Sequence, residues 1–394
     1  MVTALLIVRS LSKQEYAWYC LANNLQGTLA LFSVTGVATG LMPLGGEAIH
    51  DRTRLGSVLA SAAQLRSQLM IIGSLCAVPV FAWLLLHNGC PPMQTALLSV
   101  AALLSLAIAI AVQMLTTPFQ LAGQYHTPQV ELTGTSLIRL IGSGLLVISG
   151  IARSVSLMYA SVLTSLPMLL GYLLPQSREH VEWGQPPDSQ VTRRLHSHFL
   201  NGLPTSLTYL FEAQIAGFFI AWLGGTTQMA DLGALTRVAL ILTIPASIVS
   251  GVLTPRMARE TNLNKLWKIW LGSSAIGMAT AMVIFIAGVT FQKQLLWLLG
   301  PGYASLGKEL VLYLGFQTFA FAGTVIFTPA NSKGWIRHSW IRPFLVFGLQ
   351  AFAIPFLNLS SVTGAIGLMW AGSIGNTIMH GILLWNGWRG KGGV

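Results

Sequence analysis

The sequence predicts an all-α, polytopic membrane protein, and three observations support this prediction. Apolar side chains make up 53% of the 394 residues, whereas charged side chains make up 8%, against about a quarter in ordinary soluble domains. The mean hydropathy is +0.66. Apolar runs of about 20 residues, the length that crosses the hydrocarbon core of a bilayer, recur along the whole chain. This composition excludes a soluble enzyme and a disordered chain.

Eleven full-length spans are predicted, because long apolar runs break at glycine, proline and charged clusters as helices do. They cover residues 16–41, 67–87, 94–115, 130–150, 155–174, 199–223, 229–254, 266–290, 308–330, 341–359 and 362–385. Residues 1–8 are also apolar, but they are too few to cross a membrane and lack the parts of a secretory signal. We interpret them as the end of a first helix whose beginning is missing, which gives twelve spans in the intact protein.

Basic residues predict the orientation of the spans. If the first helix runs outward, the cytoplasmic loops hold 15 of the 22 Lys and Arg residues, Arg66 and Arg342 among them, and the opposite loops hold 5. By the positive-inside rule, both termini then face the cytoplasm. The same bias accounts for most of the net charge of +11, so we expect no nucleic-acid partner.

The chain divides into two similar halves. The hydrophilic stretch 175–198 contains three prolines and mixed charges, and we expect it to be a cytoplasmic linker between an N-terminal lobe, 1–174, and a C-terminal lobe, 199–394. Spans 16–41 and 229–254 both open on a short polar segment and end in a basic run. Six spans on each side predict two repeats of the same orientation, an arrangement that places a transporter's substrate site between them. The alternative is that any twelve-helix chain can be halved.

Amide and hydroxyl side chains recur at helical spacing in four spans. Because helix faces that meet lipid are apolar, such stripes predict a hydrophilic cavity between helices. Hydrogen bonds between packed helices are the alternative explanation. The four stripes are Tyr19, Asn23, Gln26 and Ser33; Gln113, Thr117, Gln120 and Gln124; Asn201, Thr205, Thr208 and Glu212; and Gln317, Thr324, Thr328 and Asn331.

Three charged residues lie well inside predicted spans, where each costs roughly 2.5–3.5 kcal/mol on insertion scales. Glu212 and Arg237 belong to adjacent antiparallel spans, so they form either a structural ion pair or part of a functional site. Arg139 has no acidic partner in its own span except Glu131, two turns away. A guanidinium without a carboxylate suits an anionic ligand, because its paired N–H groups match phosphate or carboxylate oxygens.

The sequence carries none of the motifs that indicate a soluble-type catalytic or cofactor site. A phosphate-binding loop, a GxSxG elbow, an HExxH pair and a glycine-rich dinucleotide turn are all absent. The three cysteines, Cys20, Cys76 and Cys90, have no metal-ligand spacing. A membrane glycan polymerase would carry a large outer loop with active groups, but residues 291–307 contain one charge, Lys293. We therefore expect neither an enzyme nor a metal or organic cofactor.

Residues 9–19, RSLSKQEYAWY, resemble the Arg-x-Leu-Ser-x-x-Glu/Asp-Tyr segment of bacterial polysaccharide-biosynthesis membrane proteins. Residues 231–237, DLGALTR, and 252–259, VLTPRMAR, are similar to the equivalent segment of their second half. Glu212 stands where these proteins often carry an acidic residue. The resemblance covers nearly the whole chain and points to the multidrug/oligosaccharidyl-lipid/polysaccharide (MOP) superfamily, with the Wzx-type O-antigen flippases as the nearest group.

This resemblance implies two six-helix lobes around a cationic cavity that moves an undecaprenyl-pyrophosphate-linked oligosaccharide across the bacterial inner membrane. The glycan would contact Asn23, Gln26, Gln113, Thr117, Thr208 and Gln317, and the pyrophosphate would contact Arg139 and Arg237. Glu212 would carry a coupling proton or sodium ion. The expected partners are the lipid-linked oligosaccharide, membrane lipids and glycan polymerase or assembly proteins. A drug/cation antiporter of the same fold and a non-transporting component of a glycan assembly complex are the alternatives.

Overall fold

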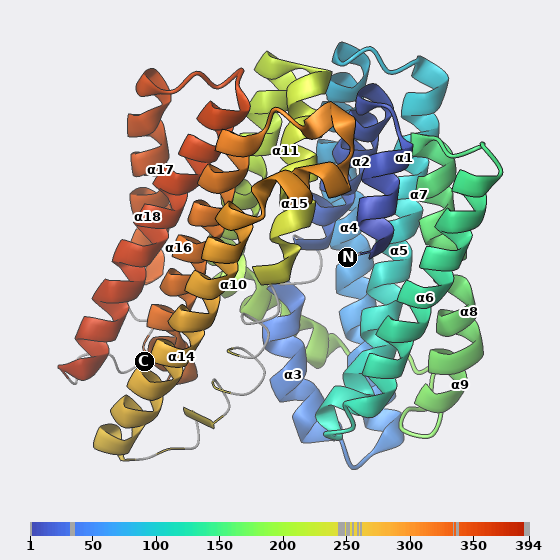
Figure 1. The fold of residues 1–394 in the computed structure, drawn as a ribbon. Coiled ribbons are helices and arrows are strands. Elements are labelled where there is room, and N and C mark those ends of the chain that lie inside the picture. Colours follow the sequence, from blue (N-terminus) through green and yellow to red (C-terminus); the bar gives the residue numbers. More distant parts are fainter. Residues whose placement is uncertain are drawn as a thin grey trace. The chain divides into compact units, whose positions relative to one another are not determined.

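The computed structural model describes residues 2–31, 36–242, 249, 253, 256–257, 260, 262–333, 335 and 339–389, and the regular structure in these residues is helical throughout (Figure 1). The all-α prediction is confirmed. Six described helices have the length and apolar composition to cross a membrane, and they coincide with six predicted spans. They are α4 Arg52–His87, α5 Pro92–Leu121, α6 His126–Ile148, the run Ser154–Ser177 that begins with α7 Ser154–Leu163, α14 Leu263–Thr290 and α16 Gly307–Ser332.

The other predicted spans are helical where they are described, except for residues 357–359 at the end of one of them, but they are interrupted, shorter or less apolar. Residues 32–35, 243–248, 250–252 and 254 within them lie outside the described residues. The helices are α2 Lys13–Ala30, α3 Gly36–Ala48, α10 Ser189–Phe219, α11 Thr226–Ala239, α17 Arg342–Ala353 and α18 Val362–Trp388, and the short first helix is α1 Val2–Ser10. Gly225 separates the π-helical turn Ile220–Gly224 from α11, and its φ of +91° is a conformation that glycine adopts without strain.

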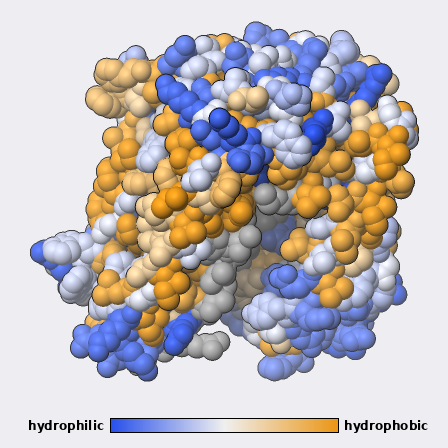
Figure 2. Space-filling model, in the orientation of Figure 1, coloured by the Kyte–Doolittle hydropathy of each residue, from blue (hydrophilic) through white to orange (hydrophobic). Residues whose placement is uncertain are grey.

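Apolar side chains cover the outer surfaces of the long helices, as lipid contact requires. Ile71 and Leu75 on α4, Ile141 on α6, and Ile276 and Val283 on α14 are all more than half exposed. Figure 2 shows apolar side chains gathered over the middle of the helices and hydrophilic side chains gathered at their ends. The chain is a multi-pass membrane protein.

The described residues form two compact units, Val2–Leu210 and Phe211–Val394. The boundary falls inside α10, whereas the sequence placed it at a linker over 175–198. The polar stretch belongs to the first unit instead. This stretch is hydrogen-bonded to the start of α4, a helix that begins 15 residues before the predicted span 67–87.

Hydroxyl groups one turn apart on α4 bind this polar stretch. Thr53 Oγ1 donates to Glu182 Oε2 at 2.7 Å, and Ser57 Oγ donates to the carbonyl of Pro186 at 2.9 Å. One turn further, Ser61 Oγ accepts from the backbone N–H of Asp188 at 2.9 Å. Because these positions share one helix face, the stretch lies along α4 rather than acting as a free linker.

The segment that carries the family resemblance begins α2 and ties it to neighbouring turns. Ser12 caps the helix, since its Oγ accepts from the N–H of Glu15 at 3.2 Å. The Glu15 carboxylate accepts from the N–H of Ser154, the first residue of α7, at 2.8 Å. Trp18 Nε1 donates to the carbonyl of Asn88, in the turn between α4 and α5, at 3.0 Å. The polar residues of this motif therefore have structural roles in the first unit.

Arg66 corrects the loop assignment made from sequence. It lies inside α4, and its side chain is fully buried. Its Nη1 contacts the sulfur of Met114 at 3.1 Å, and no carboxylate in the described part of the chain pairs with it. A buried charge without a counter-charge costs several kcal/mol in desolvation, so this arginine lowers the stability of the folded unit.

Small residues permit close packing of α17 against α18 in the second unit (Figure 1). A Cβ at Gly375 would lie 2.9 Å from both the carbonyl oxygen of Leu345 and the Cα of Val346, which are backbone atoms of α17. By contrast, a Cβ at Gly381, nearly two turns along the same helix, would meet no atom within 4 Å.

We predict that Gly375→Ala destabilises the protein by about 1–3 kcal/mol, because overpacking against a backbone forces the helices apart. Gly381→Ala, the matched control, should stabilise it by about 0.5–1 kcal/mol through helix propensity. Thermal unfolding of the purified variants in detergent, followed by tryptophan fluorescence, measures both effects. Equal stabilities of the two variants would contradict the close packing.

We also predict that Arg66→Met raises thermal stability by about 1 kcal/mol or more, since an unbranched apolar side chain replaces an uncompensated charge. The control is Arg54→Met, at an exposed position of the same helix, which should change stability by less than about 0.5 kcal/mol. A lower melting temperature for Arg66→Met than for Arg54→Met would show that the guanidinium stabilises the fold.

Candidate functional site

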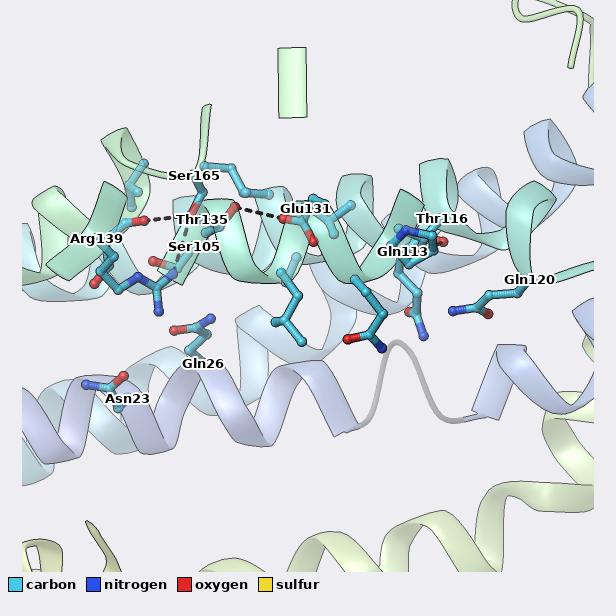
Figure 3. Close-up of a pocket in the computed structure, with 18 of the residues that line it drawn as sticks. Asn23, Gln26, Ser105, Gln113, Thr116, Gln120, Glu131, Thr135, Arg139 and Ser165 are labelled. Carbon is cyan, nitrogen blue, oxygen red and sulfur yellow. Dashed lines mark hydrogen bonds between the residues drawn. The ribbon is translucent and has the colours of Figure 1, made fainter. Parts of the chain in front are cut away.

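A hydrophilic cavity of about 490 Å³ lies within the first unit, among helices α2, α5, α6 and α7 and the turn that follows α7 (Figure 3). Its volume is in the range of small-ligand sites. The polar residues that line it are Tyr19, Asn23, Gln26, Ser105, Gln113, Thr116, Gln120, Gln129, Glu131, Thr135, Arg139, Ser161 and Ser165.

Four of the predicted site residues come together in this cavity: Asn23 and Gln26 from α2, Gln113 from α5, and Arg139 from α6. Gln120, from the same predicted stripe as Gln113, also lines it. The stripes of the predicted spans 16–41 and 94–115 therefore contribute to one cavity within the first unit.

Other residues of the predicted stripes lie elsewhere. Thr117 is buried, and its Oγ1 donates to the carbonyl of Gln113 within α5 at 2.7 Å. Thr208 is buried in α10 and is absent from the cavity lining. Ser33 and the side chains of Asn201 and Thr205 are outside the described residues.

Arg139 is the cation of the cavity. Its Nη2 donates a long hydrogen bond of 3.4 Å to Ser165 Oγ, and its buried Nε has no acceptor in the described part of the chain. In Figure 3 it lies at one end of the cavity beside Asn23 and Gln26. A guanidinium without a carboxylate partner in a polar cavity is suited to bind an anion.

Glu131 lines the cavity as well, although it was not among the site residues predicted from the sequence. Its side chain is buried, and its Oε1 accepts from Thr135 Oγ1 at 2.9 Å. Because Glu131, Thr135 and Arg139 follow one another at four-residue intervals, they share a face of α6. That spacing was visible in the sequence, and it places the acidic and basic residues about 12 Å apart along the helix axis.

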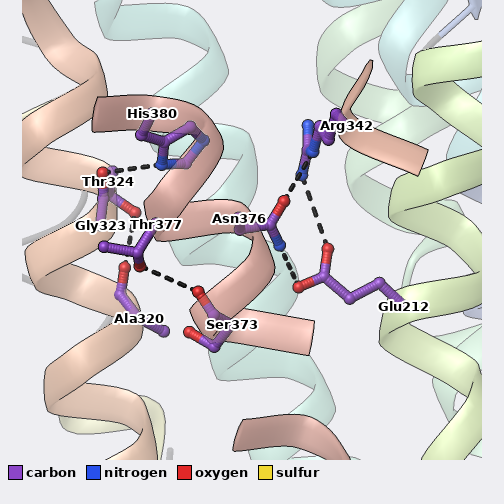
Figure 4. A network of polar contacts seen from close by, with 9 residues as sticks. All are labelled: Glu212, Ala320, Gly323, Thr324, Arg342, Ser373, Asn376, Thr377 and His380. Atoms are coloured by element: carbon purple, nitrogen blue, oxygen red, sulfur yellow. Dashed lines mark hydrogen bonds and ion pairs between the residues drawn. The ribbon is translucent and has the colours of Figure 1, made fainter. Parts of the chain in front are cut away.

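The second unit contains a compact polar triad (Figure 4). Glu212 Oε2 lies 3.5 Å from Arg342 Nη2, and Arg342 Nε donates to Asn376 Oδ1 at 2.6 Å. Asn376 Nδ2 in turn donates to Glu212 Oε1. The side chain of Arg342 is 5% exposed and that of Glu212 is 19% exposed, so the charges compensate each other away from solvent.

This triad corrects two expectations from the sequence. Arg342 begins α17 and is buried, although it was assigned to a cytoplasmic loop. It, rather than Arg237, is the cation that pairs with Glu212. Helix packing brings α17 and α18 together around Glu212. The Glu212–Arg342 pair could not be predicted from the positions of Glu212 and Arg237 in adjacent spans.

Arg237 and Gln317 belong to a different part of the second unit. Gln317 lines a smaller cavity of about 180 Å³ together with Thr236, Phe321 and Thr324. Its Nε2 donates to Tyr313 Oη at 2.9 Å. Arg237 is half-buried on α11, directly after Thr236 in the chain, and is absent from the lining of this cavity.

Comparison with solved structures identifies the fold. The chain is similar to an inward-facing multidrug resistance MATE family transporter of the MOP superfamily, with 18% identity, a TM-score of 0.77, and 98% of this chain and 93% of that one covered. The fold is MATE-like. The chain is also similar to the lipid II flippase MurJ in an inward closed conformation, with 12% identity and a TM-score of 0.68; the match covers 98% of this chain and 84% of that one.

No protein-family model matches the chain, and no curated protein matches it. At such low identities the structural likeness establishes the fold but not the substrate, which has to be inferred from the chemistry of the site. Both comparison proteins are named for transport or flipping, and neither is named as an enzyme.

We predict that the triad behaves as a coupled unit. Glu212→Gln and Arg342→Met should each destabilise the protein by about 2 kcal/mol, because each leaves one buried charge uncompensated. The double variant should lose clearly less than the sum of these effects, since it removes both charges. Thermal unfolding of all four proteins gives the coupling energy, and strictly additive losses would contradict a compensated pair.

Proposed function

We propose that this protein is a flippase that moves a polyprenyl-pyrophosphate-linked oligosaccharide across the bacterial inner membrane for surface polysaccharide synthesis. The observation that carries the proposal is the cavity of the first unit, where an unpaired guanidinium lies among amide and hydroxyl side chains. O-antigen, capsule and exopolysaccharide precursors share this substrate chemistry.

The chemistry of each part of the cavity supports this assignment. The Arg139 guanidinium offers charge-assisted hydrogen bonds to a pyrophosphate. Asn23, Gln26 and Gln113 offer both donors and acceptors, which suit the hydroxyl groups of a glycan. The polyprenyl tail is apolar and would stay in the lipid, which the exposed apolar helix surfaces contact. The MATE-like fold, shared with a lipid II flippase, is compatible with this task.

Glu212 remains our candidate for coupling transport to a proton or sodium gradient. In the structure its charge is compensated by Arg342, so an arriving cation would have to displace the guanidinium. Neutralising Glu212 removes the partner of a buried arginine, and this would shift the packing of α17 and α18. The proposal includes cytoplasmic termini and association with glycan polymerase or assembly proteins, and it assigns no catalytic step.

A drug/cation antiporter is the second candidate function. The buried carboxylate of Glu131 could attract a cationic drug, and MATE transporters share the fold. However, Tyr19 is the one aromatic residue in the described lining of this cavity, and Arg139 repels cations. Both features favour the anionic, hydroxyl-rich substrate.

The test of the proposed function is deletion of the gene in its native host, followed by complementation. We expect the deletion strain to accumulate undecaprenyl-pyrophosphate-linked oligosaccharide on the cytoplasmic leaflet and to lose surface polysaccharide, and the wild-type gene to reverse both. Normal glycan in the deletion strain, together with increased drug sensitivity, would favour the antiporter instead.

In the same assay, Arg139→Ala should reduce flipping about 10–100-fold at equal membrane abundance, the effect of losing a charged hydrogen bond of about 1.5–3 kcal/mol. Arg139→Lys should retain part of the activity because it keeps the charge. Arg193→Ala, which removes an exposed arginine, is the control and should flip normally. Parallel losses of abundance and flipping in Arg139→Ala would indicate a structural residue.

A further inference from the structure

We propose that Glu131 determines which glycan the cavity accepts: it selects an uncharged, hydroxyl-rich sugar next to the pyrophosphate and rejects an acidic sugar. This inference rests on the proposed function and adds the class of glycan to it. A difference between two regions of the cavity supports it. A hydrogen-bond donor lacks an acceptor near Arg139, whereas acceptors lack donors near Glu131.

At the Arg139 end, a donor lacks an acceptor. The guanidinium Nε is buried and unpartnered among the described residues, and the Nη2 bond to Ser165 is long, at 3.4 Å. Asn23 and Gln26 lie beside it (Figure 3). A ligand placed here must offer acceptor oxygens, and phosphate oxygens carry the charge that the guanidinium needs.

Around Glu131, acceptors lack donors. The carboxylate receives one hydrogen bond, from Thr135 Oγ1, and no cation pairs with it in the described part of the chain. Gln113 Oε1, on the helix that faces it across the cavity, is buried and also lacks a donor among the described residues. A ligand placed here must offer O–H or N–H groups, and sugar hydroxyls supply several.

The contrast with Glu212 shows what a compensated carboxylate requires in this protein. Glu212 has both a guanidinium and an amide within reach, whereas Glu131 has a single hydroxyl. A buried carboxylate with so few donors is costly unless a ligand completes its hydrogen bonds. Ligand hydroxyls would therefore bind Glu131 through charge-assisted bonds, which are stronger than neutral ones.

The same carboxylate excludes acidic sugars. A uronic acid placed beside Glu131 would bring a second negative charge close to the first, and like charges repel. The repulsion acts about 12 Å along α6 from Arg139, too far for the guanidinium to pair with the added charge. An acidic sugar next to the pyrophosphate therefore binds less tightly than a neutral one.

The test measures binding of three probes to the full chain in nanodiscs: undecaprenyl pyrophosphate, the same lipid carrying N-acetylglucosamine, and the same lipid carrying glucuronic acid. We expect the wild type to bind the neutral-sugar probe about 10-fold more tightly than the sugar-free probe, and the acidic-sugar probe more weakly than the neutral one. The variants are Glu131→Gln, Arg139→Ala and, as control, Glu179→Gln, which removes an exposed carboxylate of the same unit.

Glu131→Gln should lose most of the gain from the neutral sugar and the discrimination against the acidic one, and it should bind undecaprenyl pyrophosphate at least as tightly as the wild type, because a negative charge is removed from the cavity. Arg139→Ala should weaken all three probes, and Glu179→Gln should match the wild type. If wild-type protein binds none of the probes, the proposed function and this inference both fail. If it binds them but Glu131→Gln keeps the discrimination, or weakens every probe equally, the inference alone is overturned.

Discussion

Compensation of buried charge is the constraint on which the rest of this structure depends. A bilayer supplies no water to solvate an ionised side chain, so each buried charge needs a counter-charge, a set of hydrogen bonds or a ligand. Glu212, Arg342 and Asn376 satisfy one another within the second unit. Glu131 and Arg139 remain uncompensated by the described residues, and both line the cavity of the first unit. Arg66 is also uncompensated but does not line this cavity, so we propose ligand binding only for the two charges that both lack compensation and line the cavity.

The helices around the cavity are positioned by polar contacts at their ends. Ser12 caps α2, while Glu15 reaches the first turn of α7 and Trp18 reaches the turn before α5. These contacts hold α2 beside α5 and α7, so Asn23 and Gln26 face the same space as Gln113 and Arg139. The segment that suggests a polysaccharide flippase therefore positions the helices of the cavity, and its last residue, Tyr19, lines the cavity.

The fold and the substrate rest on different kinds of observation. Likeness to a MATE transporter and to a lipid II flippase covers 98% of the chain but at 18% and 12% identity, and one fold can carry different cargoes. The cavity narrows the choice, because its unfilled donors and acceptors differ between the Arg139 end and the Glu131 region. A ligand with phosphate at one end and hydroxyls at the other satisfies both.

The sequence by itself determined the all-α membrane class, six of the spans and the polar stripes of α2 and α5, because these depend on local composition and helical period. Tertiary structure alone decided that Arg342 rather than Arg237 compensates Glu212, that Arg66 is buried, and that residues 175–198 lie along α4. These outcomes depend on which helices pack together and how far each helix extends beyond its apolar part. Hydropathy averaged along a chain predicts neither which helices pack together nor where a helix ends beyond its apolar part.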